Sequence, residues 1–182
     1  MAVIQTDSRQ QAGKHDVKHR WLEDHGFTLA RMKLDFGDYM TPGSNVSVDT
    51  KRNLRELVQD VGRDHARFGR EMDRARDAGY RLVILTETSA ARTLDDVCGW
   101  VNDTCRRCMK YRLHICDPST APVHCLAGHK RPMQGPQLAK CCATMARNHG
   151  CVFEFVHPRD SARRICELLG LGVSEDGDRY RG

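Results

Sequence analysis

The sequence predicts an α/β fold in which helices flank a mixed central sheet, and three observations support this. Short strand-like runs alternate with longer stretches of helical spacing, in the order β-α-β-β-α-β followed by α-β-α. The apolar run RLVILTE at 81–87 is typical of a strand buried on both faces. The turn-forming residues TPGSN at 41–45 separate two strand-like runs closely enough for a hairpin.

The N-terminal half is expected to supply three strands and two helices. They are expected at 2–6 (strand), 11–25 (helix ended by Gly26), 27–36 (strand), 46–51 (strand) and 54–75 (helix bent at Gly62). The strands at 27–36 and 46–51 should pair as the hairpin. Val17, Trp21 and Leu22 are expected on the buried side of the first helix, and His65 on the buried stripe of the second.

The C-terminal half is expected to begin with an irregular segment. Residues from about 93 to 133 are rich in Cys, His and basic residues and show no sustained period, which indicates an insert. The elements that follow are expected at 135–150 (helix), 151–156 (strand) and 160–169 (helix). Residues 1–170 should therefore form one domain that carries the insert, and residues 171–182 a flexible tail.

Composition excludes several classes of protein. No apolar run approaches the roughly 20 residues that a membrane helix needs, and the N-terminus does not resemble a signal peptide. We therefore expect a cytoplasmic protein with no membrane partner. Nine cysteines, an odd number, with no export signal make a disulfide framework unfavourable, so reduced thiols or a metal site are expected. The net charge of +5 weakly favours an anionic partner.

Basic residues gather in two segments, at 51–76 and 105–131, of which the second contains almost no acids. Two such segments in one small chain indicate contact with the phosphates of DNA. The candidate DNA-binding residues are Arg52, Arg55, Arg63, Arg67, Arg106 and Arg107. For the first segment, the alternative is a solvated helix face with ion pairs along it.

The stretch GDYMTPGSNVSVDTK at 37–51 carries the clearest chemistry. Asp38 and Asp49 would lie on neighbouring hairpin strands about 5 Å apart, so their carboxylates can meet. Two such oxygen ligands suit Mg²⁺ or Mn²⁺. Lys51 shares a strand face with Asp49 and can stabilise charge that develops on a phosphate. The alternative is that Asp38 caps the turn while Asp49 and Lys51 are exposed strand residues.

The chain resembles the nuclease domain of XPF-type structure-specific endonucleases, which belong to the PD-(D/E)xK restriction-endonuclease-like superfamily. The segments that carry the resemblance are TDSRQ (6–10), GDY (37–39), VDTK (48–51) and GR (62–63). It is closest to the small single-domain versions found in bacteria and phages, which also match DTKRNLREL, DHARF and GPQLAK here. It covers about 3–90 and 134–170. The resemblance implies a restriction-endonuclease-like fold and an endonuclease that depends on Mg²⁺ or Mn²⁺.

The resemblance also assigns residues. It implies that Asp38 and Asp49 are metal ligands, that Lys51 is the catalytic lysine, and that Asp7 and Arg9 support the metal and a phosphate. Branched or flapped DNA is the implied substrate, and a role in DNA repair or recombination is the implied context. A homodimer on DNA is compatible with it.

The chain departs from the family's pattern at three positions. Gln10 stands where the family has Glu, Thr50 where eukaryotic members have Arg, and Arg55 where they have Asp. The first change removes a carboxylate and the last reverses a charge. The alternative function is therefore a DNA-binding or zinc-dependent interaction protein without catalysis.

The insert contains a second set of candidate ligands. The motif CRRC supplies Cys105 and Cys108, and Cys116 and Cys125 follow, with His114, His124 and His129 between and after them. A C-x2-C pair with two further ligands is typical of one tetrahedral structural Zn²⁺. The alternative is a set of free thiols and surface histidines, because a second C-x2-C pair is missing.

Overall fold

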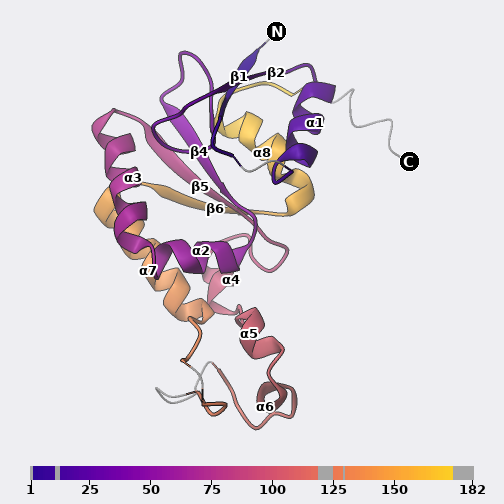
Figure 1. Ribbon diagram of the computed structural model, residues 1–182, viewed down its shortest axis with the longest axis vertical. Coiled ribbons are helices and arrows are strands. Elements are labelled where there is room, and N and C mark those ends of the chain that lie inside the picture. The colour runs from indigo at the N-terminus through magenta and orange to yellow at the C-terminus, as the bar shows by residue number, and fades with distance from the viewer. Residues whose placement is uncertain (1, 11–12, 119–124, 129, 174–182) are drawn as a thin grey trace.

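In this computed structural model, which describes residues 2–10, 13–118, 125–128 and 130–173, six strands form one mixed sheet in the order β2-β1-β3-β4-β5-β6 (Figure 1). The strands are β1 (Val3–Asp7), β2 (Thr28–Met32), β3 (Tyr39–Met40), β4 (Val46–Lys51), β5 (Arg81–Glu87) and β6 (Val152–Val156). β1 and β2 are parallel, as are β4, β5 and β6. β3 runs antiparallel to both of its neighbours, β1 and β4. The predicted α/β fold class is confirmed.

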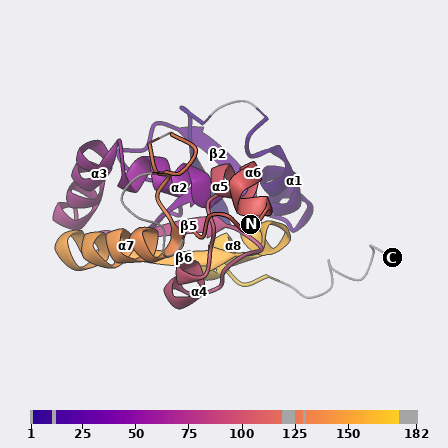
Figure 2. The same cartoon turned by 90° about the horizontal axis from the view of Figure 1, so that it is seen from below.

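Helices cover both faces of the sheet, and each face buries its own apolar cluster (Figures 1 and 2). The helices are α1 (Asp16–Asp24), α2 (Leu54–Val61), α3 (His65–Asp77), α4 (Leu94–Cys98), α5 (Asp103–Arg106), α6 (Met109–Arg112), α7 (Gly135–His149) and α8 (Ser161–Leu168), with a 3₁₀ turn at Pro158–Asp160. Leu22 of α1 and Ile165 of α8 pack on one face, and Leu57, Phe68 and Leu138 on the other. None of the described helices is both long and apolar enough to cross a membrane.

The turn at 41–45 does join two antiparallel strands, but the first of them is not the strand predicted at 27–36. The strand predicted at 27–36 ends at Met32 and pairs in parallel with β1 at the edge of the sheet, which α1 permits by crossing between them. The chain then leaves the sheet, because Leu34 and Phe36 are buried in the cluster beneath α2 and α3. The antiparallel partner of β4 is the two-residue β3, through the pair Tyr39 and Val48.

Three helix predictions also need correction. Val17 is 86% exposed, whereas Lys18 is buried, because its ammonium reaches the Glu87 carboxylate at the end of β5. An apolar pattern cannot reveal a charged residue that is buried by pairing. His65 is exposed, with Nδ1 3.1 Å from the Gly62 carbonyl oxygen. The helix predicted at 54–75 is two helices, α2 and α3, separated at the predicted position.

The segment expected to be irregular from residue 93 begins with structure that belongs to the core. Val97 of α4 and Trp100 just after it are buried in the same cluster as Leu138 of α7. Gly135 sits so close to α4 that a Cβ would lie 2.1 Å from the Val97 carbonyl oxygen. Within 103–133, the described residues form the short helices α5 and α6 and turns, while the helix 135–149 and the strand 152–156 lie where they were predicted.

Beneath α1, a buried tyrosine connects the sheet to two histidines. Tyr39 is fully buried, and its hydroxyl lies 3.0 Å from His15 Nδ1 and 3.1 Å from His19 Nε2. Burial lowers the pKa of His15 to about 4. The native protein therefore holds His15 neutral at a pH where an unfolded chain would protonate it.

We expect the free energy of unfolding to fall as the pH drops from 6.5 towards about 4, because only the unfolded state takes up the His15 proton in that window. His15→Gln keeps a polar partner for Tyr39 but cannot titrate, so it should reduce this loss of stability. Urea unfolding of both proteins at about pH 7 and about pH 5 measures the difference. Equal pH dependence in the two proteins would contradict the role given to His15.

Candidate active site at the end of strand β4

The centre of the site is a pair of opposite charges on β4. Asp49 and Lys51 are two residues apart and therefore project from the same face of the strand. β4 lies inside the sheet between β3 and β5, where Asp49 pairs with Ile84 and Lys51 with Thr86. Both charged residues are buried, at 6% and 8% exposure. The alternative that they are exposed strand residues is therefore wrong.

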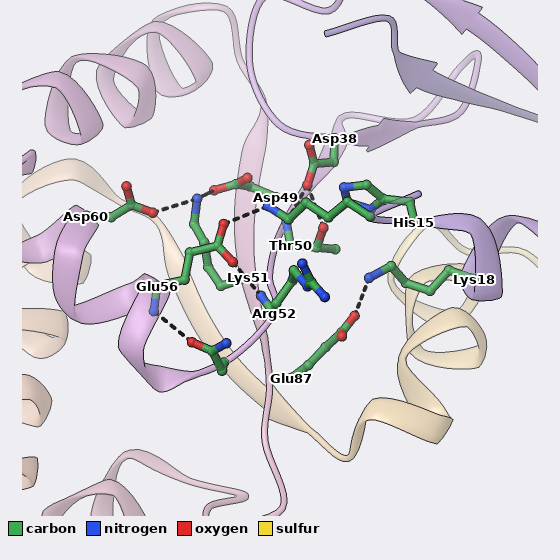
Figure 3. Close-up of polar contacts among 12 residues, drawn as sticks. His15, Lys18, Asp38, Asp49, Thr50, Lys51, Arg52, Glu56, Asp60 and Glu87 are labelled. Carbon is green, nitrogen blue, oxygen red and sulfur yellow. Dashed lines mark hydrogen bonds and ion pairs between the residues drawn. The ribbon is translucent and has the colours of Figure 1, made fainter. Parts of the chain in front are cut away.

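Lys51 lies between two carboxylates, one from its own strand and one from a helix (Figure 3). Its Nζ is 2.7 Å from Asp49 Oδ2 and 2.9 Å from Asp60 Oδ2 of α2. The ring of Phe68 lies under the ammonium, with its centroid 4.8 Å away. Asp60 Oδ1 in turn accepts a hydrogen bond from Arg67 of α3 at 3.0 Å. The charges thus alternate in sign from the strand to the surface of α3.

Burial and charge move the pKa values of this pair. Burial raises the pKa of Asp49 to about 7; Lys51 opposes the shift, while Asp38 and Glu71 add to it. Burial on its own would lower the pKa of Lys51, but Asp49 and Asp60 outweigh it and raise the pKa above its usual value. Lys51 is therefore a permanent cation, and Asp49 is a carboxylate whose negative charge is unfavourable unless a further cation approaches.

Asp38 stands just before β3, on a turn that demands glycine. Gly37 has a φ of 69°, and a Cβ there would lie 2.2 Å from Ser47 Oγ. The Gly37 amide donates to Glu71 at 3.1 Å, and the Asp38 amide to the Val48 carbonyl at 2.8 Å. The half-buried Asp38 carboxylate accepts two hydrogen bonds from Thr50, one from its backbone amide at 2.9 Å and one from its side-chain hydroxyl at 2.5 Å. Asp38 is thus attached to β4, next to Asp49.

The end of β1 completes the site. The Asp7 amide donates to the Asp38 carbonyl at 3.0 Å, so β1 ends beside the Asp38 turn. The Asp7 carboxylate accepts from Arg9 Nε at 2.9 Å, and Arg9 also donates to the Leu34 carbonyl. This hydrogen bond to Asp7 raises the pKa of the mostly exposed Arg9 guanidinium. The Gln10 amide donates to the Asp38 carbonyl at 3.1 Å, so it contributes no charge.

One hollow of about 390 Å³ joins these groups. The five residues predicted to be catalytic, Asp7, Arg9, Asp38, Asp49 and Lys51, all line it. Its wall also includes Lys14, Asp35, Gly37, Thr50, Glu56, Arg67, Glu71 and Arg74. The structure thus brings together every residue of the predicted catalytic set, from β1, β4, the turn after β1 and the turn before β3.

The donors in this hollow fit a hard divalent cation. The buried Asp49 Oδ2 lies 2.7 Å from Lys51 Nζ, and a carboxylate oxygen in such a contact retains a lone pair for a further cation. Among the described residues, no three candidate ligands converge on one point as a closed metal cage does. Mg²⁺ is commonly held by one or two carboxylates, with water and phosphate oxygens completing its shell. Asp38 and Asp49 match that arrangement.

The predicted DNA-binding arginines divide into two groups. Arg52, Arg55 and Arg67 line a second hollow of about 530 Å³ along α2. Arg67 lines both hollows, as do Lys14 and Glu56, so the basic surface is continuous with the site. Arg63, Arg106 and Arg107 line neither hollow; Arg63 lies 3.5 Å from Asp64, and the other two belong to the insert.

Two acidic residues of the site were missed by the sequence analysis. Asp60 lies nine positions after Lys51, between the buried residues Leu57 and Val61. An acid beside the apolar stripe of a helix is a usable signal that a cation lies beneath it. Glu71 likewise precedes the buried Met72 on α3. Neither falls in the segments that carry the family resemblance.

The four candidate zinc ligands lie together but away from this site. Cys105, Cys108, Cys116 and Cys125 are half-buried free thiols that line one cavity of the insert. His114 is exposed, and His124 and His129 lie outside the described residues.

The fold is similar to that of two solved XPF structures. XPF from Aeropyrum pernix has a TM-score of 0.55 at 14% identity over 92% of this chain, and XPF from the same organism in complex with DNA has a TM-score of 0.57 at 13% identity over the whole chain. The chain spans 63% and 68% of those two chains. No family model matches the chain, and no curated protein matches its sequence. The six-stranded mixed sheet and its helices thus have the XPF-type, restriction-endonuclease-like fold.

Proposed function

We propose that the protein is an endonuclease that depends on Mg²⁺ or Mn²⁺ and hydrolyses phosphodiester bonds of branched or flapped DNA. The observation that carries the proposal is the hollow at the end of β4, where Asp38, Asp49 and the permanent cation Lys51 meet. The similarity to XPF, including a structure that holds DNA, supports the same proposal.

Asp38 and Asp49 would hold the cation, and Asp7 would add negative charge beside it. A bound divalent ion supplies Lewis acidity and lowers the pKa of a water molecule. Lys51 contributes a fixed positive charge at the place where charge develops on the phosphate. Arg9, fixed by Asp7 and largely exposed to the hollow, is placed to bind a phosphate oxygen.

Asp60 would act as a positioning residue. Lys51 contacts both Asp49 and Asp60, so Asp49 can turn towards a cation while Asp60 still holds the ammonium. Without Asp60, Lys51 would have only Asp49 and would compete with the metal for it. In this arrangement Asp49 would bind the metal and Asp60 would hold the ammonium of Lys51.

The basic hollow along α2 would bind the DNA backbone next to the reacting phosphate. Contacts of this type position the nucleic acid without selecting a sequence. The preference for branched or flapped DNA and the formation of a homodimer rest on the family resemblance. Both the substrate preference and the homodimer are therefore proposals.

The competing proposal is a DNA-binding protein without catalysis, and the residue at position 10, Gln10, favours it. The Gln10 side-chain amide donates a hydrogen bond to the Asp38 carbonyl, whereas the family has a carboxylate at position 10. In that case the protein would retard DNA but leave it whole in Mg²⁺ or Mn²⁺. Incubation with labelled flap, fork, junction and linear DNA, with and without metal, decides between the two.

Asp38→Asn, Asp49→Asn and Lys51→Ala should each reduce cleavage by roughly 100-fold or more, because each removes a metal ligand or a transition-state charge. DNA binding should persist and should tighten for the two Asp variants, which repel phosphate less. Cleavage rates and gel retardation on the same flap substrate measure both effects. Asp77→Asn, on the exposed end of α3, is the control and should cleave normally.

Asp49→Asn should also unfold at a higher temperature than the wild type when metal is absent, because it removes a carboxylate that is unfavourable when buried. A loss of cleavage by an intact variant would then be chemical. Full cleavage by Asp49→Asn would show that the site has been assigned wrongly.

Asp60→Asn should lower the cleavage rate by roughly ten-fold and raise the Mg²⁺ concentration needed for half-maximal cleavage, because Lys51 then competes for Asp49. Asp60→Glu should largely restore the cleavage rate and the Mg²⁺ concentration needed for half-maximal cleavage. Metal titrations of the cleavage rate measure both quantities, with Asp77→Asn, at the exposed end of α3, as a control. An unchanged metal requirement would mean that Asp60 serves stability alone.

Replacing both Arg52 and Arg55 by Ala should weaken binding to all DNA sequences alike and flatten its salt dependence by about one unit of slope per lost phosphate contact. The pairs Arg63 with Arg67 and Arg106 with Arg107 should act in the same way if their segments contact DNA. Fluorescence anisotropy at several salt concentrations measures the slope. Arg81→Ala, at the end of β5 away from the site, is the control. An arginine pair whose replacement gives the same salt slope as Arg81→Ala does not contact DNA.

A further inference from the structure

The described residues of the insert at 103–133 form almost no apolar core of their own. The insert leaves the body between α4 and α7 and projects from it with α5 and α6 (Figures 1 and 2). Of its described residues, Pro118 alone is buried. Its large apolar side chains are exposed instead: Met109 at 59%, Leu113 at 59%, Ile115 at 62% and Leu126 at 44%. Segments this short, with so little apolar burial, are usually ordered by disulfides or metals.

All four cysteines of the insert face one cavity of about 350 Å³. The motif CRRC closes a tight turn, because the Cys108 amide donates to the Cys105 carbonyl at 2.9 Å. Such a turn presents two thiols on the same side. The remaining cysteines, Cys116 and Cys125, reach the cavity from separate segments of the chain.

Hydrogen bonds from α6 hold those two segments in place. After α6 the chain reverses at His114, which has a φ of 55°, and the Cys116 amide donates to the Lys110 carbonyl at 3.1 Å. The Lys110 ammonium donates to the Leu126 carbonyl, next to Cys125. One residue of α6 thus connects both segments to the CRRC turn.

Gln134, at the point where the insert meets the core, holds Cys105 in place. The buried Gln134 accepts a hydrogen bond from the Asn102 amide at 3.1 Å, which joins the two ends of the insert. Its amide nitrogen lies 3.3 Å from Cys105 Sγ and donates to it. Hydrogen bonds of this kind orient metal ligands from outside the coordination shell.

The charges around the cavity suit a thiolate cluster. Arg107, Lys110 and Lys130 line it together with the four cysteines. A zinc ion with four thiolates carries a net charge of −2, which nearby cations stabilise. Apolar side chains, among them Pro118, Leu126 and Pro132, complete the lining and would limit the access of water to such a cluster.

We propose that Cys105, Cys108, Cys116 and Cys125 bind one structural zinc ion that replaces the missing core of the insert. Each thiol that binds releases its proton to solvent, so one Zn²⁺ is exchanged for four protons. As the thiols stand, no three candidate ligands of the described residues share metal-binding spacing, so the ion would draw them together across the cavity. The short turns that carry them have no packed core to oppose this.

The test is the zinc content of the full chain, purified without added metal. We expect about one zinc ion per chain in the wild type and at most about a tenth of that in Cys105→Ser and in Cys116→Ser. Cys98→Ser, at an exposed thiol of α4, and Cys141→Ser, on α7, are matched controls that should keep the zinc. Zinc retained in the insert variants, or absent from the wild type, would overturn the proposal.

Thiol reactivity gives a second measurement that does not depend on how the variants fold. The four insert thiols of the native protein should react slowly with a thiol reagent and rapidly after a chelator removes the metal. Replacement by Co²⁺ should produce the absorption bands of tetrahedral thiolate coordination. Four thiols that react at once, or that have formed disulfides, would contradict the zinc site. Because no readout is DNA cleavage, failure here is distinct from failure of the proposed nuclease activity.

Discussion

The buried ammonium of Lys51, held between Asp49 and Asp60, is the interaction on which the site depends. Removing the lysine would leave two buried carboxylates without compensation, and breaking a buried pair in this way typically costs about 3–5 kcal/mol. Here two carboxylates share one lysine, so the cluster retains a negative charge that Arg67 offsets only at its outer edge. Burial, with the charges of Asp38 and Glu71 added to it, raises the pKa of Asp49, and the excess of negative charge makes the hollow suitable for a divalent cation.

The topology of the sheet brings the other residues to this cluster. β3 is only two residues long, yet it is antiparallel to β1 and β4 and joins the two parallel parts of the sheet. The ends of β1 and β4 and the start of β3 therefore lie together, which places Asp7 and Asp38 beside Asp49. The tight turn at Gly37 makes this junction possible. Glu56 of α2 and Arg67 and Glu71 of α3 form part of the wall of the hollow that opens at this junction.

Local patterns predicted much of this, and non-local contacts account for what they missed. The i, i+2 spacing of Asp49 and Lys51 was sufficient to place both on one face, and the apolar run at 81–87 identified a strand buried within the sheet. The hairpin was assigned to the wrong strand, because strand pairing depends on where Leu34 and Phe36 are buried, and alternation alone does not show that. Asp60 was missed for a similar reason: its role depends on Lys51, which approaches it only in the folded chain.

Binding of Mn²⁺ in the absence of DNA, followed by electron paramagnetic resonance, tests most directly whether the carboxylates of the β4 hollow hold a metal. The account predicts saturable binding of about one ion by the wild type and binding at least about ten-fold weaker by Asp49→Asn, since one of two protein ligands is lost. Lys51→Ala should bind Mn²⁺ at least as tightly as the wild type, because a competing cation has been removed. Equal affinity in the wild type and Asp49→Asn would contradict the metal site and, with it, the proposed chemistry.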